Sequence, residues 1–182
     1  METLLDEKEL AKQIIVEIVR LYGGKAPTKT GLFKAFYFAH LYYVGRAVGY
    51  LSNWPIVKMP GGPGIDQADQ LLAELVDEGK LAERIEPIGP YQAVQYEAAV
   101  DAIPEGLSLP AIEAIREAVL FVKDKSAAEL SELTHEFSRS WISAEMGAEL
   151  NIYIDIPPKD VYESRLANMQ RVESVFEEVW GR

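Results

Sequence analysis

The segment from Leu32 to Tyr43 constrains the fold of this 182-residue chain more than any other feature. It is apolar or aromatic on nearly every side of a helix, and Thr28 or Thr30 can open that helix just after Pro27. A helix that lacks a polar face has to be buried on all sides. We therefore expect a helix ending near Tyr43 at the centre of a small fold.

The composition is that of a globular protein with a sizeable core, because 48% of the residues are hydrophobic. The absence of cysteine excludes disulfide frameworks and thiolate chemistry. The N-terminus carries acids where a secretory signal carries bases, and no apolar run approaches the roughly 18 residues of a spanning helix. We expect a cytoplasmic protein.

Charge is distributed unevenly along the chain. The net charge is −11, yet no acidic residue occurs between Glu17 and Asp66. Those bases could form a basic surface or could pair with acids from elsewhere in the fold, and the sequence leaves both alternatives open. The basic residues of this interval are Arg20, Lys25, Lys29, Lys34, Arg46 and Lys58.

The first half of the chain shows the order of a winged helix. Apolar residues at spacing four predict a helix from Leu10 to Tyr22, and a later helix should run over 65–76 and stop at Gly79. Residues 80–86 and 91–96 predict a β-hairpin. Between the second and third helices we expect a short strand over 54–58 and a tight turn at Pro60–Gly64 that sets the entry angle of the third helix.

The second half should be helical. Ser108 opens one helix, and Ser126 with Glu129 three residues later forms a capping box for the next. A further helix is predicted from Trp141 to Leu150, and the alternation of Ile152, Ile154 and Ile156 predicts a short strand.

We predict a single domain, mainly α with a small β-hairpin. Residues 1–100 would form a winged-helix-like core with the hairpin at 80–97, followed by a helical part over 107–150 and a C-terminal docking helix over 158–180. A seam is expected near 101–106. No internal repeat or low-complexity linker interrupts the chain.

A catalytic or metal-binding mechanism that depends on histidine has few candidate residues, because the chain contains only two histidines, His40 and His135. His40 lies in the most apolar helix, where a satisfied core histidine is the expected state. Glu132 and His135 form a Glu-x-x-His step, but a di-iron site needs a second such step, and the residue three before His40 is Tyr37. We expect no metal site.

Catalytic motifs are also missing. The Gly-rich loop at 61–64 lacks the following Lys-Ser/Thr of a P-loop, and Pro63 removes a donor. No Gly-x-Ser-x-Gly elbow occurs. We therefore expect no enzyme activity, no catalytic residue and no cofactor.

A DNA-binding regulator is the main alternative suggested by the winged-helix order. The third helix of such a fold enters the major groove, but here it carries five acids, and the predicted wing at 87–90 has no Arg or Lys. Acids near phosphate oppose binding. The scaffold resembles that of a DNA reader, and the surface does not.

Aromatic, Met and basic residues of the first half favour protein binding, because such side chains concentrate in protein interfaces. Taken singly, Trp54 and Tyr91 are each better interpreted as core residues, whereas the cluster as a whole favours partner binding. The expected partner-binding set is Lys34, Arg46, Trp54, Lys58, Met59, Ile88 and Tyr91.

Four segments carry a resemblance to a known family. They are Lys34-Ala35-Phe36-Tyr37-Phe38-Ala39-His40, the loop at 59–64, the run 71–81, and Ser126 to Glu136 with Trp141 beyond. Over roughly residues 8 to 150 the chain resembles the Panacea antitoxin domain, also called SocA-like or phage-associated GepA-like. It departs from that family in the loop, which lacks an aromatic residue, and after Asn151, where no likeness extends.

The resemblance implies a non-enzymatic protein that neutralises a partner toxin by direct binding or delivers it to a protease. It leaves open which toxin is bound, and a DNA-binding regulator or a phage-associated accessory protein stays the alternative. The motif residues to which it gives a structural role are Tyr37, His40, Pro63, Ser126, Glu129, Thr134, His135 and Trp141.

Overall fold

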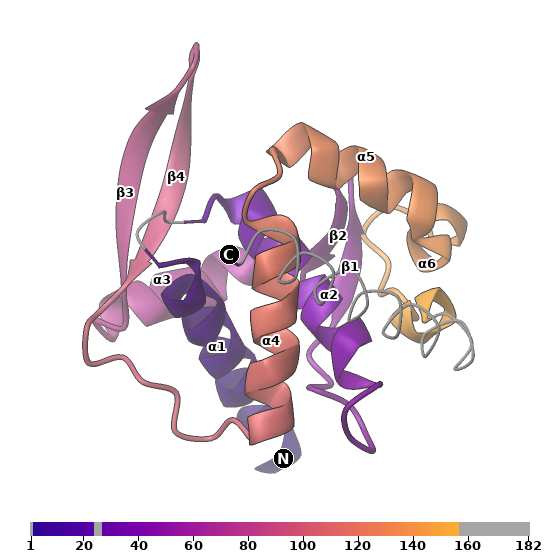
Figure 1. The fold of residues 1–182 in the computed structure, drawn as a ribbon, viewed down its shortest axis with the longest axis horizontal. Helices are drawn as coiled ribbons and strands as arrows, with labels where there is room; N and C mark the ends of the chain where they lie inside the picture. The colour runs from indigo at the N-terminus through magenta and orange to yellow at the C-terminus, as the bar shows by residue number, and fades with distance from the viewer. Residues whose placement is uncertain (1, 24–26, 157–182) are drawn as a thin grey trace, which may run out of the picture.

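The computed structural model describes residues 2–23 and 27–156 (Figure 1). Its centre is formed by three helices, α1 (Glu2–Tyr22), α2 (Lys29–Tyr43) and α4 (Leu109–Val122). α2 packs most extensively against α4, and α1 contacts both. The described part is mainly helical, with two small antiparallel hairpins beside the helices.

The central helix forms as the sequence predicts. Thr28 has extended backbone, and its side chain accepts a hydrogen bond from the Gly31 N–H, which caps the helix. Phe36, Tyr37 and their neighbours are buried in one hydrophobic cluster with the inner face of α1. Burial of α2 on every side is thereby confirmed.

The first hairpin corrects one expectation. β1 (Ile56–Met59) pairs antiparallel with β2 (Gly62–Ile65), so reading the whole of Pro60–Gly64 as a turn is wrong. Gly62 has φ +105, and a Cβ there would overlap the Lys34 ammonium and the Thr134 hydroxyl. The glycine is therefore needed because the strand passes close to α2 and to a later helix, α5 (Ala127–Phe137), which carries Thr134.

The second hairpin follows the predicted order. α3 (Ala68–Asp77) leads to β3 (Leu81–Ile88) and β4 (Tyr91–Ala98). Leu81 and Tyr96 are buried at its base. Figure 1 shows the ribbon rising away from the helices, with β3 on its outer side.

The capping box of α5 (Ala127–Phe137) is confirmed. Ser126 Oγ accepts from the Glu129 N–H at 3.2 Å, and the Glu129 carboxylate accepts from the Ser126 N–H at 2.7 Å. Each bond satisfies a donor that the first turn of a helix otherwise leaves open.

The next helix is shorter than predicted, because α6 covers Arg139–Ser143 and does not reach Leu150. The chain beyond it runs along β1 instead: the Lys58 N–H donates to the Ala148 carbonyl at 2.9 Å, and the Leu150 N–H donates to the Ile56 carbonyl at 2.7 Å. The open edge of β1 satisfies backbone groups that would otherwise continue the helix.

The strand predicted over 152–156 is also wrong. Ile152–Asp155 forms the 3₁₀ helix η1, with Ile152 buried and Ile154 46% exposed. The turn brings the Asp155 carboxylate into the interior, where it accepts from the Tyr37 hydroxyl. The docking helix predicted over 158–180 lies outside the described residues, and the division of the chain into parts stays a prediction.

Candidate functional site

Three of the five described bases from the acid-free interval form ion pairs in the fold. The structure therefore favours the second alternative, in which acids elsewhere offset them, over a free basic surface. Lys25 lies outside the described residues. The ion pairs are Arg20 with Glu17, Lys29 with Asp69, and Arg46 with Glu117.

Lys34 differs from these bases because it is buried and has no acidic partner among the described residues. Its side chain is 2% exposed. The ammonium donates to the Gly61 carbonyl at 2.6 Å and to the Pro63 carbonyl at 3.2 Å. Lys34 therefore holds the turn and second strand of the first hairpin against α2, and it is not part of an exposed surface.

Burial lowers the pKa of Lys34 to about 8. The unfolded chain therefore keeps the Lys34 proton to higher pH than the folded chain does. Below pH 8 the buried charge lowers the free energy of unfolding, and this free energy rises as the pH increases from about 8 toward the usual lysine pKa of 10.5. We expect unfolding free energy to increase by about 2 kcal/mol between pH 7.5 and 9.5. Urea unfolding at these pH values measures it.

Lys34→Met should lack this rise, whereas Lys29→Met, at an exposed lysine paired with Asp69, should retain it. A rise of equal size in the Lys34→Met protein would contradict the assignment. The comparison is made below pH 10 because tyrosines in the unfolded chain ionise above it.

Lys58, His135 and Trp141 form what we call the Trp141 stack. The His135 ring lies 4.0 Å from the Trp141 ring at an interplanar angle of 14°. The Lys58 ammonium lies 4.3 Å from the Trp141 ring centroid and donates to the Ala144 carbonyl. Trp141 Nε1–H donates to the Met59 carbonyl at 2.9 Å, so the stack fastens α5 and α6 to β1.

His135 has an unusual environment within this stack. It lies in the last turn of α5, and its Nε2 is buried with no hydrogen-bond partner in the part of the chain that the structure describes. Leaving such an atom unpaired is unfavourable. His135 instead stacks on the face of Trp141. No pattern in the sequence indicated this contact.

The other motif residues serve packing and capping. His40 Nδ1 contacts the Phe36 carbonyl at 2.8 Å, and Nε2 contacts Ser52 Oγ at 2.8 Å. Thr134 is buried and donates to the Leu130 carbonyl at 3.0 Å. Both polar side chains are satisfied internally, which leaves them no exposed group for chemistry.

Asp155 organises a buried polar network that the sequence reasoning missed. Its carboxylate accepts from the hydroxyls of Tyr37, Ser138 and Ser140 at 2.6 to 2.8 Å and from the Ser140 N–H at 2.8 Å. An acid within the apolar run Ile152–Ile156 was the available signal. These bonds join α2, α6 and η1.

The predicted partner-binding residues do not form one surface. Tyr91, 76% exposed, lies at the tip of the second hairpin with Ile88 opposite it in register. Trp54 is half-buried and donates to the Asp66 carbonyl. Lys58 and Met59 lie in β1. Lys34 is buried against the first hairpin, and Arg46 is paired with Glu117 of α4. The predicted residues are therefore divided between the hairpin tip and other parts of the molecule.

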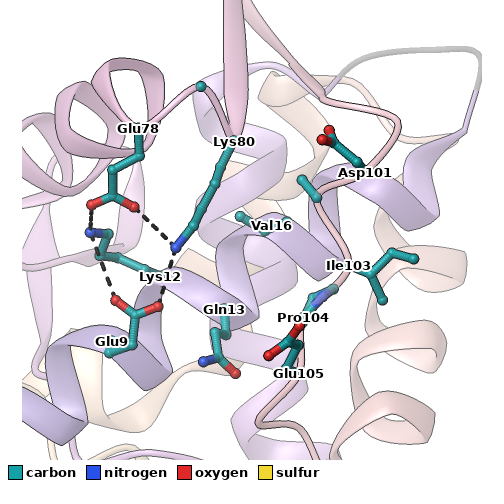
Figure 2. Close-up of a pocket in the computed structure, with 12 residues that line it drawn as sticks. Glu9, Lys12, Gln13, Val16, Glu78, Lys80, Asp101, Ile103, Pro104 and Glu105 are labelled. Carbon is teal, nitrogen blue, oxygen red and sulfur yellow. Dashed lines mark hydrogen bonds and ion pairs between the residues drawn. The ribbon is translucent and has the colours of Figure 1, made fainter.

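A pocket of about 350 Å³ lies between α1, the end of α3 and the chain after β4. Figure 2 shows its charged wall, in which Lys12 and Lys80 contact Glu9 and Glu78. Lys12 is buried and its charge is offset by these acids. Within residues 2–23 and 27–156, no group of three or more His, Cys, Asp or Glu side chains is placed to hold a metal ion.

The described part of the chain is mainly helical, and its charged and aromatic motif residues contact other residues within the fold. None of the helices in the described part of the chain has the length and apolar character of a membrane span. The family model for the antitoxin SocA-like Panacea domain matches residues 32–142, and the chain belongs to that family. Comparison with the curated proteins and with the solved structures gave no match.

Proposed function

We propose that this protein is a non-enzymatic antitoxin that neutralises a partner toxin by binding it directly. Membership of the antitoxin SocA-like Panacea family carries the proposal. The hydrogen bonds of His40, Thr134 and Lys34 support its non-enzymatic part, because these three side chains are occupied in holding the fold. The protein would act in the cytoplasm.

The test is an affinity pull-down of the tagged protein at near-native level from its host, with protein and nucleic acid quantified in the same eluate. A single stoichiometric protein that is toxic when expressed alone, and harmless when expressed with this chain, is the expected result. Loss of that partner after co-expression with a host protease would support delivery for degradation. An eluate without such a protein would overturn the proposal.

The hairpin tip is the first surface to examine once the partner is in hand. We expect Ile88→Asp combined with Tyr91→Ala to weaken binding at least tenfold, because aromatic and aliphatic anchors dominate interface energy. Isothermal titration with the purified partner measures it. The matched control is Ile142→Ala, since Ile142 is 56% exposed on α6, and unchanged binding in the tip variant would exclude this surface.

Replacement of His135 should act on folding more than on binding. His135→Ala removes a ring stacked on Trp141, a contact worth on the order of 1 kcal/mol beyond its area. We expect a lower urea midpoint with partner affinity changed less than about threefold. If affinity fell while the midpoint stayed constant, the residue would belong to the binding surface.

The alternative, a winged-helix DNA-binding regulator or a phage-associated accessory protein, has less support. α3 carries the acids Asp69, Glu74 and Asp77, and Arg20, Lys29 and Arg46 are each paired with an acid, which opposes binding to phosphates. Gel shifts at low salt test it. Binding of duplex DNA that weakens steeply with added salt would favour the regulator.

A further inference from the structure

The outer edge of β3 is unpaired in the part of the chain that the structure describes. β3 pairs with β4, and the far side of β4 is covered at its base, where Thr28 bridges to Gln95. The side chains of residues 82–87 are all exposed, and β3 faces outward in Figure 1. An open strand edge is a template for another strand.

The register shows which backbone groups lie on that edge. Alternate residues of an antiparallel pair bond to each other, and those between them direct N–H and C=O outward. Tyr96, opposite Glu83, sends its N–H outward to the Pro27 carbonyl, so Glu83, Ile85 and Pro87 point to the free edge. Pro87 has no N–H, and it stands where β4 requires none.

The charges along β3 favour one register for a symmetric pairing of two β3 strands. Two copies of β3 related by a two-fold axis must pair residues that share a face of the pleat. A register centred on Glu83, Arg84 or Glu86 places that residue opposite itself, and like charges directly opposite are destabilising. A register centred on Ile85 instead places Arg84 opposite Glu86 on both sides of the axis.

We propose that this chain forms a homodimer in which two β3 strands pair antiparallel about Ile85. The two hairpins then form one four-stranded sheet. The Ile85 residues exchange both backbone hydrogen bonds, and each Glu83 N–H donates to the carbonyl of the partner's Pro87. Ile85, 62% exposed in one chain, gains apolar neighbours across the axis.

Charge exchange tests this register. Sedimentation equilibrium of the purified full chain over the micromolar range should show a dimer. Arg84→Glu and Glu86→Arg should each raise the dimer Kd about tenfold or more, because both cross-strand pairs become like-charged. The exchange variant Arg84→Glu with Glu86→Arg should return the Kd to within about threefold of the original, since its pairs are again opposite in sign.

Mixing the two single variants gives a second readout. At positions 84 and 86, the Arg84→Glu chain carries two acids and the Glu86→Arg chain carries two bases. The mixture should therefore form a heterodimer, although each variant alone is mostly monomeric. The Arg84–Glu97 ion pair is lost in the two variants that contain Arg84→Glu, but both side chains are well exposed, and such pairs contribute little to stability. Circular dichroism of each variant checks that the fold is retained.

A chain that is monomeric throughout the concentration range would overturn the proposal. So would a dimer whose Kd is unaffected by the single variants, or an exchange variant as weak as either of them. Ile85→Pro provides an independent check, because it removes an outward N–H without touching the β4 ladder and should abolish the dimer. All of these measurements use the purified chain alone and are independent of any toxin.

Discussion

Acidification from pH 7 to pH 5 is expected to lower the free energy of unfolding by roughly 2 kcal/mol through His40 alone. Burial lowers the pKa of His40 to about 4, although the Phe36 carbonyl opposes the shift. The unfolded chain therefore takes up a proton near pH 6.5, before the folded chain does. Stability from this residue is complete above that value and is lost as pH falls toward 4.

Urea unfolding at pH 7, 6 and 5 measures the effect, and His40→Asn should remove most of it. Ser52→Ala is the matched control, because it deletes the hydroxyl beside Nε2 and keeps the titrating ring. The lowered carboxylate pKa values of Glu74 and Glu78 also make acid destabilising, but only below about pH 4.5. Equal pH dependence in the His40→Asn protein would show that another group is responsible.

Asp155→Ala is expected to destabilise the protein by about 3 to 5 kcal/mol. The substitution removes the acceptor shared by the Tyr37, Ser138 and Ser140 hydroxyls. The Tyr37 hydroxyl would be left without an acceptor in a buried environment, and the Ser138 and Ser140 hydroxyls, 3.1 Å apart, would keep only each other. Thermal unfolding followed by circular dichroism measures the loss.

Two variants separate the network from the packing around it. Asp155→Asn keeps the shape but presents an amide donor to other donors, and we expect it to be nearly as damaging as Asp155→Ala. Tyr37→Phe removes one donor together with its hydrogen bond and should cost only about 1 kcal/mol. If Asp155→Ala cost no more than Tyr37→Phe, the carboxylate would not be the organising group.

Features with local signals were predictable from the sequence. Thr28 and the apolar run after it defined α2, and Ser126 with Glu129 defined the start of α5, because caps and periodic burial depend on residues close in the chain. The second hairpin was found for the same reason. Family membership was predictable from the motif segments, and the match over 32–142 confirms it.

Features that depend on distant contacts were not predictable. The strand at Gly62 exists because Lys34 donates to the carbonyls on either side of it, and α6 ends early because the next residues bond to β1. The 3₁₀ turn at Asp155 depends on Tyr37, which lies 118 positions earlier. No window of adjacent residues contains these partners.

The hydrogen bond from Tyr37 to Asp155 also shows that the boundaries of the family match differ from the boundaries of the folded unit. The matched segment ends at residue 142, before the carboxylate that satisfies a hydroxyl within it. The segment likewise begins after α1, whose Ile14, Ile15 and Ile18 are 0% exposed. A fragment cut at the family boundaries would open the core on one side and orphan buried donors on the other, so the inherited motif depends on flanks that the family model does not cover.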